Sequence, residues 1–296
     1  MAPIWSKQPF KAIYTGFAIL KLPFLLVLLV IRYGFKPFRP LRGWSFTAKA
    51  KERFSLVSPA ELKIYSGVLA PGTIKPVPVG GLWFPAPISA AATEDRSREK
   101  VVLHFPGGAF VLAFGFEGVG QNVSNTMAQH MKATRTFVAQ YRVATSSDTR
   151  FPAALQDLLT FYHYILSLGV DPKNIIVSGD SAGGNLVASL LQWGADAYLP
   201  IGEDAYEAVS YISPLNHPFK LSIPLFLNAG TGEAFYDSVE MFAKEMAEVN
   251  GDKRIRFHST ALAPHGLLQG HETMGMTAQL KVAVEDACKF FEEQKN

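Results

Sequence analysis

Cysteine is almost absent from this chain, since Cys288 is the only one among 296 residues. A single thiol excludes an internal disulfide and a zinc site built from spaced cysteines, and it suits a reducing compartment. Charge is also scarce: charged residues make up 18% of the chain, the net charge is +3, and no long basic run occurs. Nucleic-acid binding is therefore not expected.

Glycine-rich stretches are present, but they lack the patterns that bind nucleotides. None has the Lys-Ser/Thr of a phosphate loop or the spacing of a dinucleotide fingerprint. We therefore expect no nucleotide, metal or other cofactor. Apolar residues make up 48% of the chain instead, which predicts a sizeable core in one domain of ordinary α/β enzyme size, with at most a small appendage.

The most hydrophobic window is residues 13–31. A helix needs about 20 apolar residues to span a bilayer, and this window has that length in spite of Lys21 and Pro23 near its centre. No small-residue cleavage site follows, which favours a retained anchor over a removed signal peptide. Basic residues are denser after the window than before it. By the positive-inside rule we expect a single-pass membrane anchor with a cytosol-facing catalytic part, the endoplasmic reticulum being one candidate membrane.

An alternative is that this segment forms an amphipathic helix over the entrance of the protein's own active site. Residues 34–51 are rich in Pro, Gly and basic residues and are typical of a linker at a membrane surface. The predicted organisation is thus a hydrophobic segment with its linker in residues 1–50, followed by a catalytic domain in residues 51–296.

The stretch Gly179-Asp180-Ser181-Ala182-Gly183-Gly184-Asn185 follows an apolar run, 174–178, that predicts a buried strand. It precedes an apolar run that predicts a helix. A G-x-S-x-G between a strand and a helix is the pattern of a nucleophile elbow, in which small neighbours permit a strained turn that exposes the serine. The same glycines could equally serve close packing, so the motif alone leaves both interpretations open.

Strand and helix patterns alternate along the rest of the chain. Short apolar runs between 68 and 87 predict an edge hairpin. Further strands are predicted at 101–105, 136–140, 223–229 and 255–258, and further helices at 122–132, from Pro152 to Gly169, at 237–249 and at 277–293. This alternation predicts a doubly wound, mainly parallel sheet whose functional residues lie at the carboxyl ends of the strands. Ser181, Glu233 and His265 all follow predicted strands.

Four motifs in this order resemble the hormone-sensitive-lipase-like branch of the α/β-hydrolases, which includes arylacetamide deacetylases and many fungal esterases. They are His104-Phe105-Pro106-Gly107-Gly108-Ala109-Phe110, Tyr141-Arg142-Val143-Ala144 with Phe151-Pro152-Ala153-Ala154, the elbow, and Pro264-His265-Gly266. The resemblance covers about residues 101–270. It implies an α/β-hydrolase fold that acts on a carboxylic ester through an acyl-enzyme.

The resemblance further implies Ser181 as nucleophile, His265 as base and Glu233 as the acid that orients the base. The backbone N–H groups of Gly108, Ala109 and Ala182 would form the oxyanion hole. Other residues compete for some of these roles. Asp237 is an alternative acid that also suits a helix N-cap, His258 and His271 are alternative bases, and Asp180 is a candidate for fixing the elbow.

Two features depart from the family. The oxyanion loop reads Pro106-Gly107-Gly108-Ala109 where the family has His-Gly-Gly-Gly, which changes its shape more than its chemistry. The chain between Ser181 and Glu233 is also shorter than the resemblance leads us to expect, by about 40 residues. This predicts the loss of one sheet strand and much of the cap, with 209–212 as a candidate strand to fill the gap.

The predicted function is therefore hydrolysis of a small or medium apolar ester, a secondary metabolite being one candidate. The shortened segment supports an alternative, a weakened or inactive relative that binds a ligand or arose by deletion. Acyl transfer by the same triad is a further alternative.

Overall fold

The computed structural model describes residues 52–88, 96–113, 115–196 and 207–294. The predicted anchor and linker lie outside these ranges. No helix in the described ranges is both long enough and apolar enough to cross a membrane.

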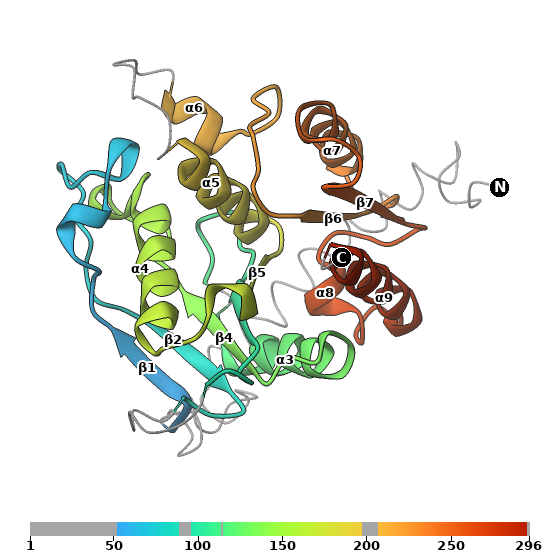
Figure 1. Cartoon of the computed structure of the whole chain (residues 1–296), viewed down its shortest axis with the longest axis horizontal. Helices are drawn as coiled ribbons and strands as arrows, with labels where there is room; N and C mark the ends of the chain where they lie inside the picture. The colour runs from blue at the N-terminus through green and yellow to red at the C-terminus, as the bar shows by residue number, and fades with distance from the viewer. Residues whose placement is uncertain (1–51, 89–95, 114, 197–206, 295–296) are drawn as a thin grey trace, which may run out of the picture. The chain divides into compact units, whose positions relative to one another are not determined.

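Five strands form one sheet in the order β1-β2-β4-β3-β5 (Figure 1). They are β1 (Phe54–Val57), β2 (Val79–Phe84), β3 (Val101–Phe105), β4 (Arg135–Gln140) and β5 (Ile175–Gly179). β3 pairs in parallel with β4 and β5, whereas β2 is antiparallel to β1 and β4. The predicted edge hairpin is thus shifted: β1 precedes the predicted run, and 67–69 form a 3₁₀ turn instead of a strand.

Alternation along β3 shows why these residues form a central strand. Leu103 and Phe105 point to one face, where they pack with α4 (Ala153–Ser167) and α5 (Ala182–Asp196). Val102 points to the other face and packs with α3 (Glu117–Met131), α8 (Leu267–Gly270) and α9 (Thr277–Glu293). Every residue of β3 is buried, as expected for a strand covered on both faces.

A buried ion pair fixes the start of α4 against the end of β4. Arg142 donates from Nε and Nη2 to the Asp157 carboxylate at 2.8–3.0 Å, and its backbone N–H donates to the same carboxylate at 2.8 Å. The Asp157 side chain is fully buried. Arg142 Nη2 also donates to the Ala153 carbonyl at 3.1 Å, so Arg142 and Ala153 of the two motifs both belong to the framework.

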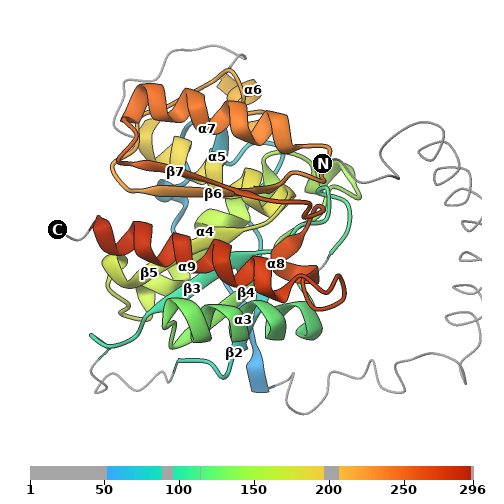
Figure 2. The same cartoon turned by 90° about the vertical axis from the view of Figure 1, so that its right-hand side faces the viewer.

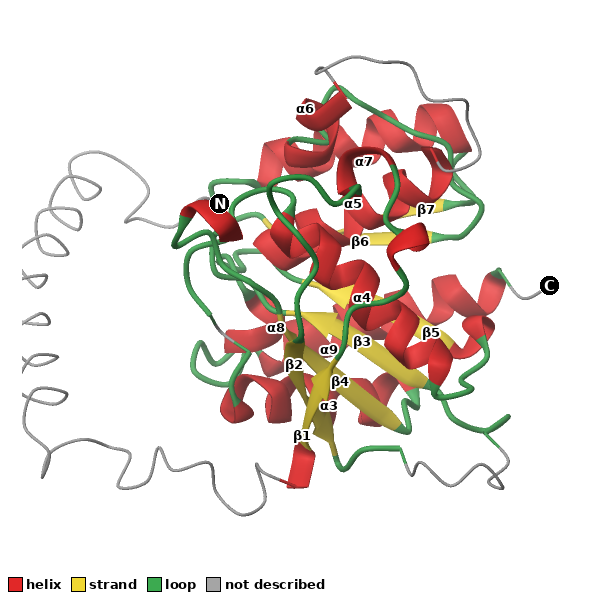
Figure 3. Ribbon diagram, turned by 90° about the vertical axis from the view of Figure 1, so that its left-hand side faces the viewer, coloured by secondary structure: helices red, strands yellow, loops and turns green. Residues whose placement is uncertain are grey.

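The sheet is interrupted after β5. β6 (Leu225–Gly230) and β7 (Ile255–Thr260) form a separate parallel pair, and Figure 3 shows this pair apart from the other five strands. In Figure 2, α7 (Tyr236–Asn250) covers one side of the pair and α9 the other. Within the described residues no strand pairs with both β5 and β6. Part of the segment where the strand loss is predicted, 197–206, lies outside the described ranges.

The segment proposed to fill this gap does not do so. Residues 209–212 belong to α6 (Glu207–Ile212), a short helix beside α5. Ser189 and Asn185 of α5 donate to the carbonyls of Tyr211 and Ile212, at 2.6 and 3.1 Å. The C-terminal end of α6 is thus held by side chains of α5, which leaves it no role as a strand.

Candidate active site

The elbow has the backbone geometry that its glycines predict. Ser181 has a φ of 53°, in the left-handed region where the backbone of any residue other than glycine is strained. A methyl group on Gly179 would meet the backbone of Gly183, and a methyl group on Gly183 would meet the carbonyl of Phe105. The glycines thus permit close packing of the backbone around the turn. The same turn leaves Ser181 exposed at the start of α5.

Ser181, His265 and Glu233 form a hydrogen-bonded chain. Nε2 of His265 lies 2.7 Å from Oγ of Ser181. Nδ1 of His265 makes a short hydrogen bond with Oε2 of Glu233. Oε1 of Glu233 accepts the Gly230 N–H at 3.0 Å, which holds the carboxylate in place. The acid is nearly buried, with 8% of its side chain exposed, whereas 44% of the His265 side chain is exposed.

The competing candidates lie elsewhere. Asp237 is exposed in the first turn of α7. His258 lies in β7 with its Nδ1 2.8 Å from Asp286, and His271 is buried with its Nδ1 3.1 Å from the Thr277 hydroxyl. Among the candidate acids and bases, only Glu233 and His265 contact each other in line with Ser181.

The loop after β3 lies beside the elbow, where an oxyanion hole would form. Gly108, Ala109 and Phe110 all have positive φ, of 136°, 51° and 62°. For the backbone N–H groups of Gly108, Ala109 and Ala182, no acceptor is found among the described residues. A glycine at position 109 would adopt this φ without strain, whereas the alanine present there is strained.

Two side chains hold this loop, and only one of them was anticipated. Asp180, a candidate from the sequence for fixing the elbow, accepts the Gly107 N–H at 3.3 Å and so joins the elbow to this loop. Tyr141 donates its hydroxyl to the Pro106 carbonyl at 2.6 Å. Burial, with a smaller contribution from the Asp180 charge, raises the pKa of Tyr141, so the phenol stays a donor at neutral pH. The motif at 141–144 marked Tyr141 without revealing its partner.

Two further contacts have no strong signal in the sequence. The ring of Phe235 lies 5.4 Å from that of His265, centroid to centroid. Gln269 of α8 makes a short hydrogen bond to Oδ1 of Asp180. Gln269 follows His265 by four residues, but His265 precedes α8 and its N-cap Gly266, so no helical spacing links the two side chains.

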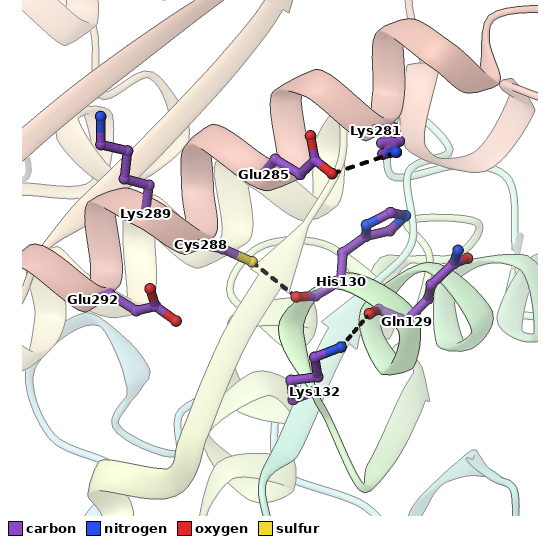
Figure 4. Close-up of a pocket in the computed structure, with 8 residues that line it drawn as sticks. All are labelled: Gln129, His130, Lys132, Lys281, Glu285, Cys288, Lys289 and Glu292. Carbon is purple, nitrogen blue, oxygen red and sulfur yellow. Dashed lines mark hydrogen bonds and ion pairs between the residues drawn. The ribbon is translucent and has the colours of Figure 1, made fainter.

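A cavity of about 400 Å³ lies between α3 and α9, away from these residues (Figure 4). Its lining is polar and includes Lys132, Glu285 and Cys288, and none of the predicted site residues takes part. The Cys288 thiol donates to the His130 carbonyl at 3.1 Å, and burial raises its pKa. Within the described ranges, no cluster of three or more His, Cys, Asp or Glu is placed to hold a metal ion.

The described residues have the α/β-hydrolase fold. Residues 102–197 match the family described as alpha/beta hydrolase fold. The chain has this fold. The structure is similar to carboxyl esterase 2 of the fungus Tuber melanosporum, with a TM-score of 0.56 at 15% identity over 81% of this chain and 88% of that one.

Curated relatives agree with the predicted resemblance. The chain is 28% identical to Lipase 2 of Moraxella over 200 residues, which are 62% of this chain and 44% of the relative. It is 30% identical to human arylacetamide deacetylase-like 2 over 105 residues, which are 33% of this chain and 25% of the relative. The chain thus spans less than half the length of either relative. The predicted resemblance to the arylacetamide deacetylases and the predicted fold are confirmed.

Proposed function

We propose that this protein is a serine hydrolase that cleaves a carboxylic ester through Ser181, His265 and Glu233. The observation that carries the proposal is the continuous hydrogen-bonded chain from Ser181 Oγ through His265 to the Glu233 carboxylate. A serine hydroxyl is a weak nucleophile until a neutral imidazole accepts its proton. Relatives and structural neighbours that are named lipases, esterases and deacetylases support the same reaction class.

The first half of the reaction forms the acyl-enzyme. His265 Nε2 takes the Ser181 proton while Oγ attacks the ester carbonyl, and Glu233 stabilises the imidazolium that results. The negative oxygen of the tetrahedral intermediate is held by the N–H groups of Gly108, Ala109 and Ala182. Each such donor is worth about 2.7–4 kcal/mol of barrier. His265 then protonates the leaving alcohol, and water releases the acid by the reverse sequence.

The substrate class we propose is a small or medium apolar ester, a secondary metabolite being one candidate. Large apolar side chains are exposed on the segments that carry the triad and the oxyanion loop: Val111 at 51%, Leu112 at 55%, Phe235 at 57% and Leu262 at 67%. Exposed apolar groups around a nucleophile favour an apolar acyl or alcohol group, because contact removes both surfaces from water.

The test is labelling of Ser181 by a fluorophosphonate, together with hydrolysis of p-nitrophenyl esters of increasing acyl length. Wild-type protein should label and turn over, with the best rates for apolar acyl groups, and Ser181→Ala should do neither. Equal rates for the two proteins would refute Ser181 as nucleophile. Product analysis with added alcohols would distinguish hydrolysis from acyl transfer.

A second candidate is a weakened or inactive relative, and the interrupted sheet is the specific observation that favours it. The two halves of the triad are carried by separate sheets, so their alignment depends on packing between helices and on few directional contacts. A folded protein whose Ser181 does not react with the fluorophosphonate would favour this candidate.

We also propose that residues 13–31 anchor the protein in a membrane with the catalytic domain in the cytosol. The apolar length of this segment and the basic residues that follow it support the proposal. Full-length protein should sediment with membranes, and a chain that starts at Lys49 should stay in the supernatant. Recovery of both in the supernatant would overturn the anchor.

A further inference from the structure

The interruption of the sheet divides the candidate active site between two parts of the domain. Ser181 and the oxyanion loop follow β5 and β3 of the five-stranded sheet, whereas Glu233 and His265 follow β6 and β7. In a continuous sheet, hydrogen bonds between strands would fix the distance between these parts. Within the described residues β5 and β6 are not paired, so other contacts must set the position of His265 relative to Ser181.

The loops that carry Glu233 and His265 are locked to each other. The Gly232 N–H donates to the Ala263 carbonyl at 3.0 Å, and the Leu262 N–H donates to the Thr231 hydroxyl at 2.8 Å. A methyl group on Gly232 would press against the same Ala263 carbonyl. These two loops therefore shift together, and a displacement would change the distance from His265 to Ser181 while leaving its contact with the acid intact.

A second hydrogen bond beside the His265–Ser181 contact joins the two parts. Gln269 Nε2 donates to Oδ1 of Asp180, the residue just before the nucleophile. The same oxygen accepts the Gly107 N–H of the oxyanion loop at 3.3 Å. It also lies 3.4 Å from Nε2 of His104, whose side chain is fully buried in β3. Polar groups from the oxyanion loop, the central strand and α8 thus all lie close to one carboxylate oxygen.

Apolar packing also connects the two parts, but it is not directional. Val102 and Met127 pack against Leu267 and Leu280, which joins α3 and β3 to α8 and α9. Such contacts tolerate small shifts, whereas a hydrogen bond to a largely buried carboxylate is sensitive to distance and angle. The side chain of Asp180 is only 14% exposed, so water competes weakly for Gln269.

We infer that Gln269 is a positioning residue, which holds His265 in line with Ser181 across the interrupted sheet by binding Asp180. The inference rests on the proposed function, because His265 is taken as the base. A displacement of about 1 Å at a catalytic group can cost about 100-fold in rate. Loss of the Gln269 donor should therefore lower kcat more than it changes KM.

The variant that tests this is Gln269→Met, which keeps the length of the side chain and removes the donor. Gln279→Met is the matched control, since Gln279 is exposed on α9. With a p-nitrophenyl ester, Gln269→Met should lower kcat by about 10- to 100-fold. Its KM should stay within about threefold of the wild-type value, because substrate binding does not use the donor. Gln279→Met should match the wild type. Gln269→Ala removes the same donor and serves if methionine is not accommodated.

Coupling to Asp180 separates a positioning role from a general loss of stability. Asp180→Asn retains an oxygen acceptor, so adding Gln269→Met in that background should still lower kcat. Asp180→Leu removes the acceptor, so adding Gln269→Met there should cause no further loss. Equal losses in both backgrounds would overturn the inference, as would an unchanged kcat or an effect confined to KM.

A measurement without turnover keeps this inference distinct from the proposed function. The imidazole NMR signal of His265, assigned by its absence in His265→Gln, should shift in Gln269→Met and not in Gln279→Met. If wild-type Ser181 does not label and the signal shifts as described, the proposed function fails and the positioning role stands. If Ser181 labels and neither kcat nor the signal responds to Gln269→Met, the positioning role fails alone.

Discussion

The choice between Glu233 and Asp237 as the acid gives the sharpest single test of the site. In Glu233→Gln, Oε1 of the new amide can still accept the Gly230 N–H at the position where the carboxylate accepts it at 3.0 Å. The amide nitrogen then faces Nδ1 of His265. Because that nitrogen is a donor, Nδ1 must accept, and the ring proton moves to Nε2, 2.7 Å from Ser181 Oγ. His265 can then no longer take the serine proton.

The size of the effect follows from this tautomer change. Replacing the acid of a Ser-His-acid triad by its amide leaves the geometry intact and lowers kcat by about 10⁴-fold, equivalent to about 5.5 kcal/mol of barrier. Asp237→Asn is the control, since Asp237 is exposed in the first turn of α7 and lies outside the hydrogen-bonded chain. It should retain wild-type kcat.

The assay is steady-state hydrolysis of p-nitrophenyl butyrate by wild type, Glu233→Gln, Asp237→Asn and Ser181→Ala, with circular dichroism to check folding. Residual activity in Glu233→Gln above about a tenth of wild type would refute the tautomer argument, since an amide at this place should cost far more. A large loss in Asp237→Asn with a small one in Glu233→Gln would assign the acid to Asp237 instead.

Three further predictions concern the framework of the site. Asp157→Ala leaves the largely buried Arg142 guanidinium without its carboxylate partner and should lower the free energy of unfolding by about 3–5 kcal/mol in urea titrations. A loss below about 1 kcal/mol would mean that water and the neighbouring oxygens replace the carboxylate. Gly183→Ala places a methyl group against the Phe105 carbonyl and should abolish fluorophosphonate labelling; normal labelling would show that the elbow can relax. Tyr141→Phe removes the hydrogen bond to the oxyanion loop and should cost about 1 kcal/mol of stability with a slower acylation step, and an unchanged acylation rate would limit the phenol to a structural role.

Most of the elements could be predicted because their signals are local. The closing helix 277–293 has the predicted bounds, and the strands at β3 and β7 differ from the prediction by no more than two residues at either end. The prediction of a hairpin within 68–87 was wrong. Its two apolar runs are interrupted by Gly and Pro, and β2 pairs instead with an earlier segment, 54–57, to which no tight turn connects it. The prediction of a strand at 209–212 was also wrong. Its apolar run fits either a strand or a helix, and the contacts with α5 decide for the helix.

The sequence by itself determined the fold class, the nucleophile elbow and the order of the candidate catalytic residues, because a G-x-S-x-G after a buried strand and polar residues after later strands are local patterns. It also revealed that the chain is short after α5. Only the tertiary structure decided which acid and which histidine meet, since Glu233 and His265 are 32 residues apart and are brought together by the pairing of β6 with β7. The tertiary structure also showed that Gln269 reaches Asp180 across the interrupted sheet, 89 residues away in the chain. Contacts between distant segments depend on how sheets and helices pack, so local sequence patterns do not predict them.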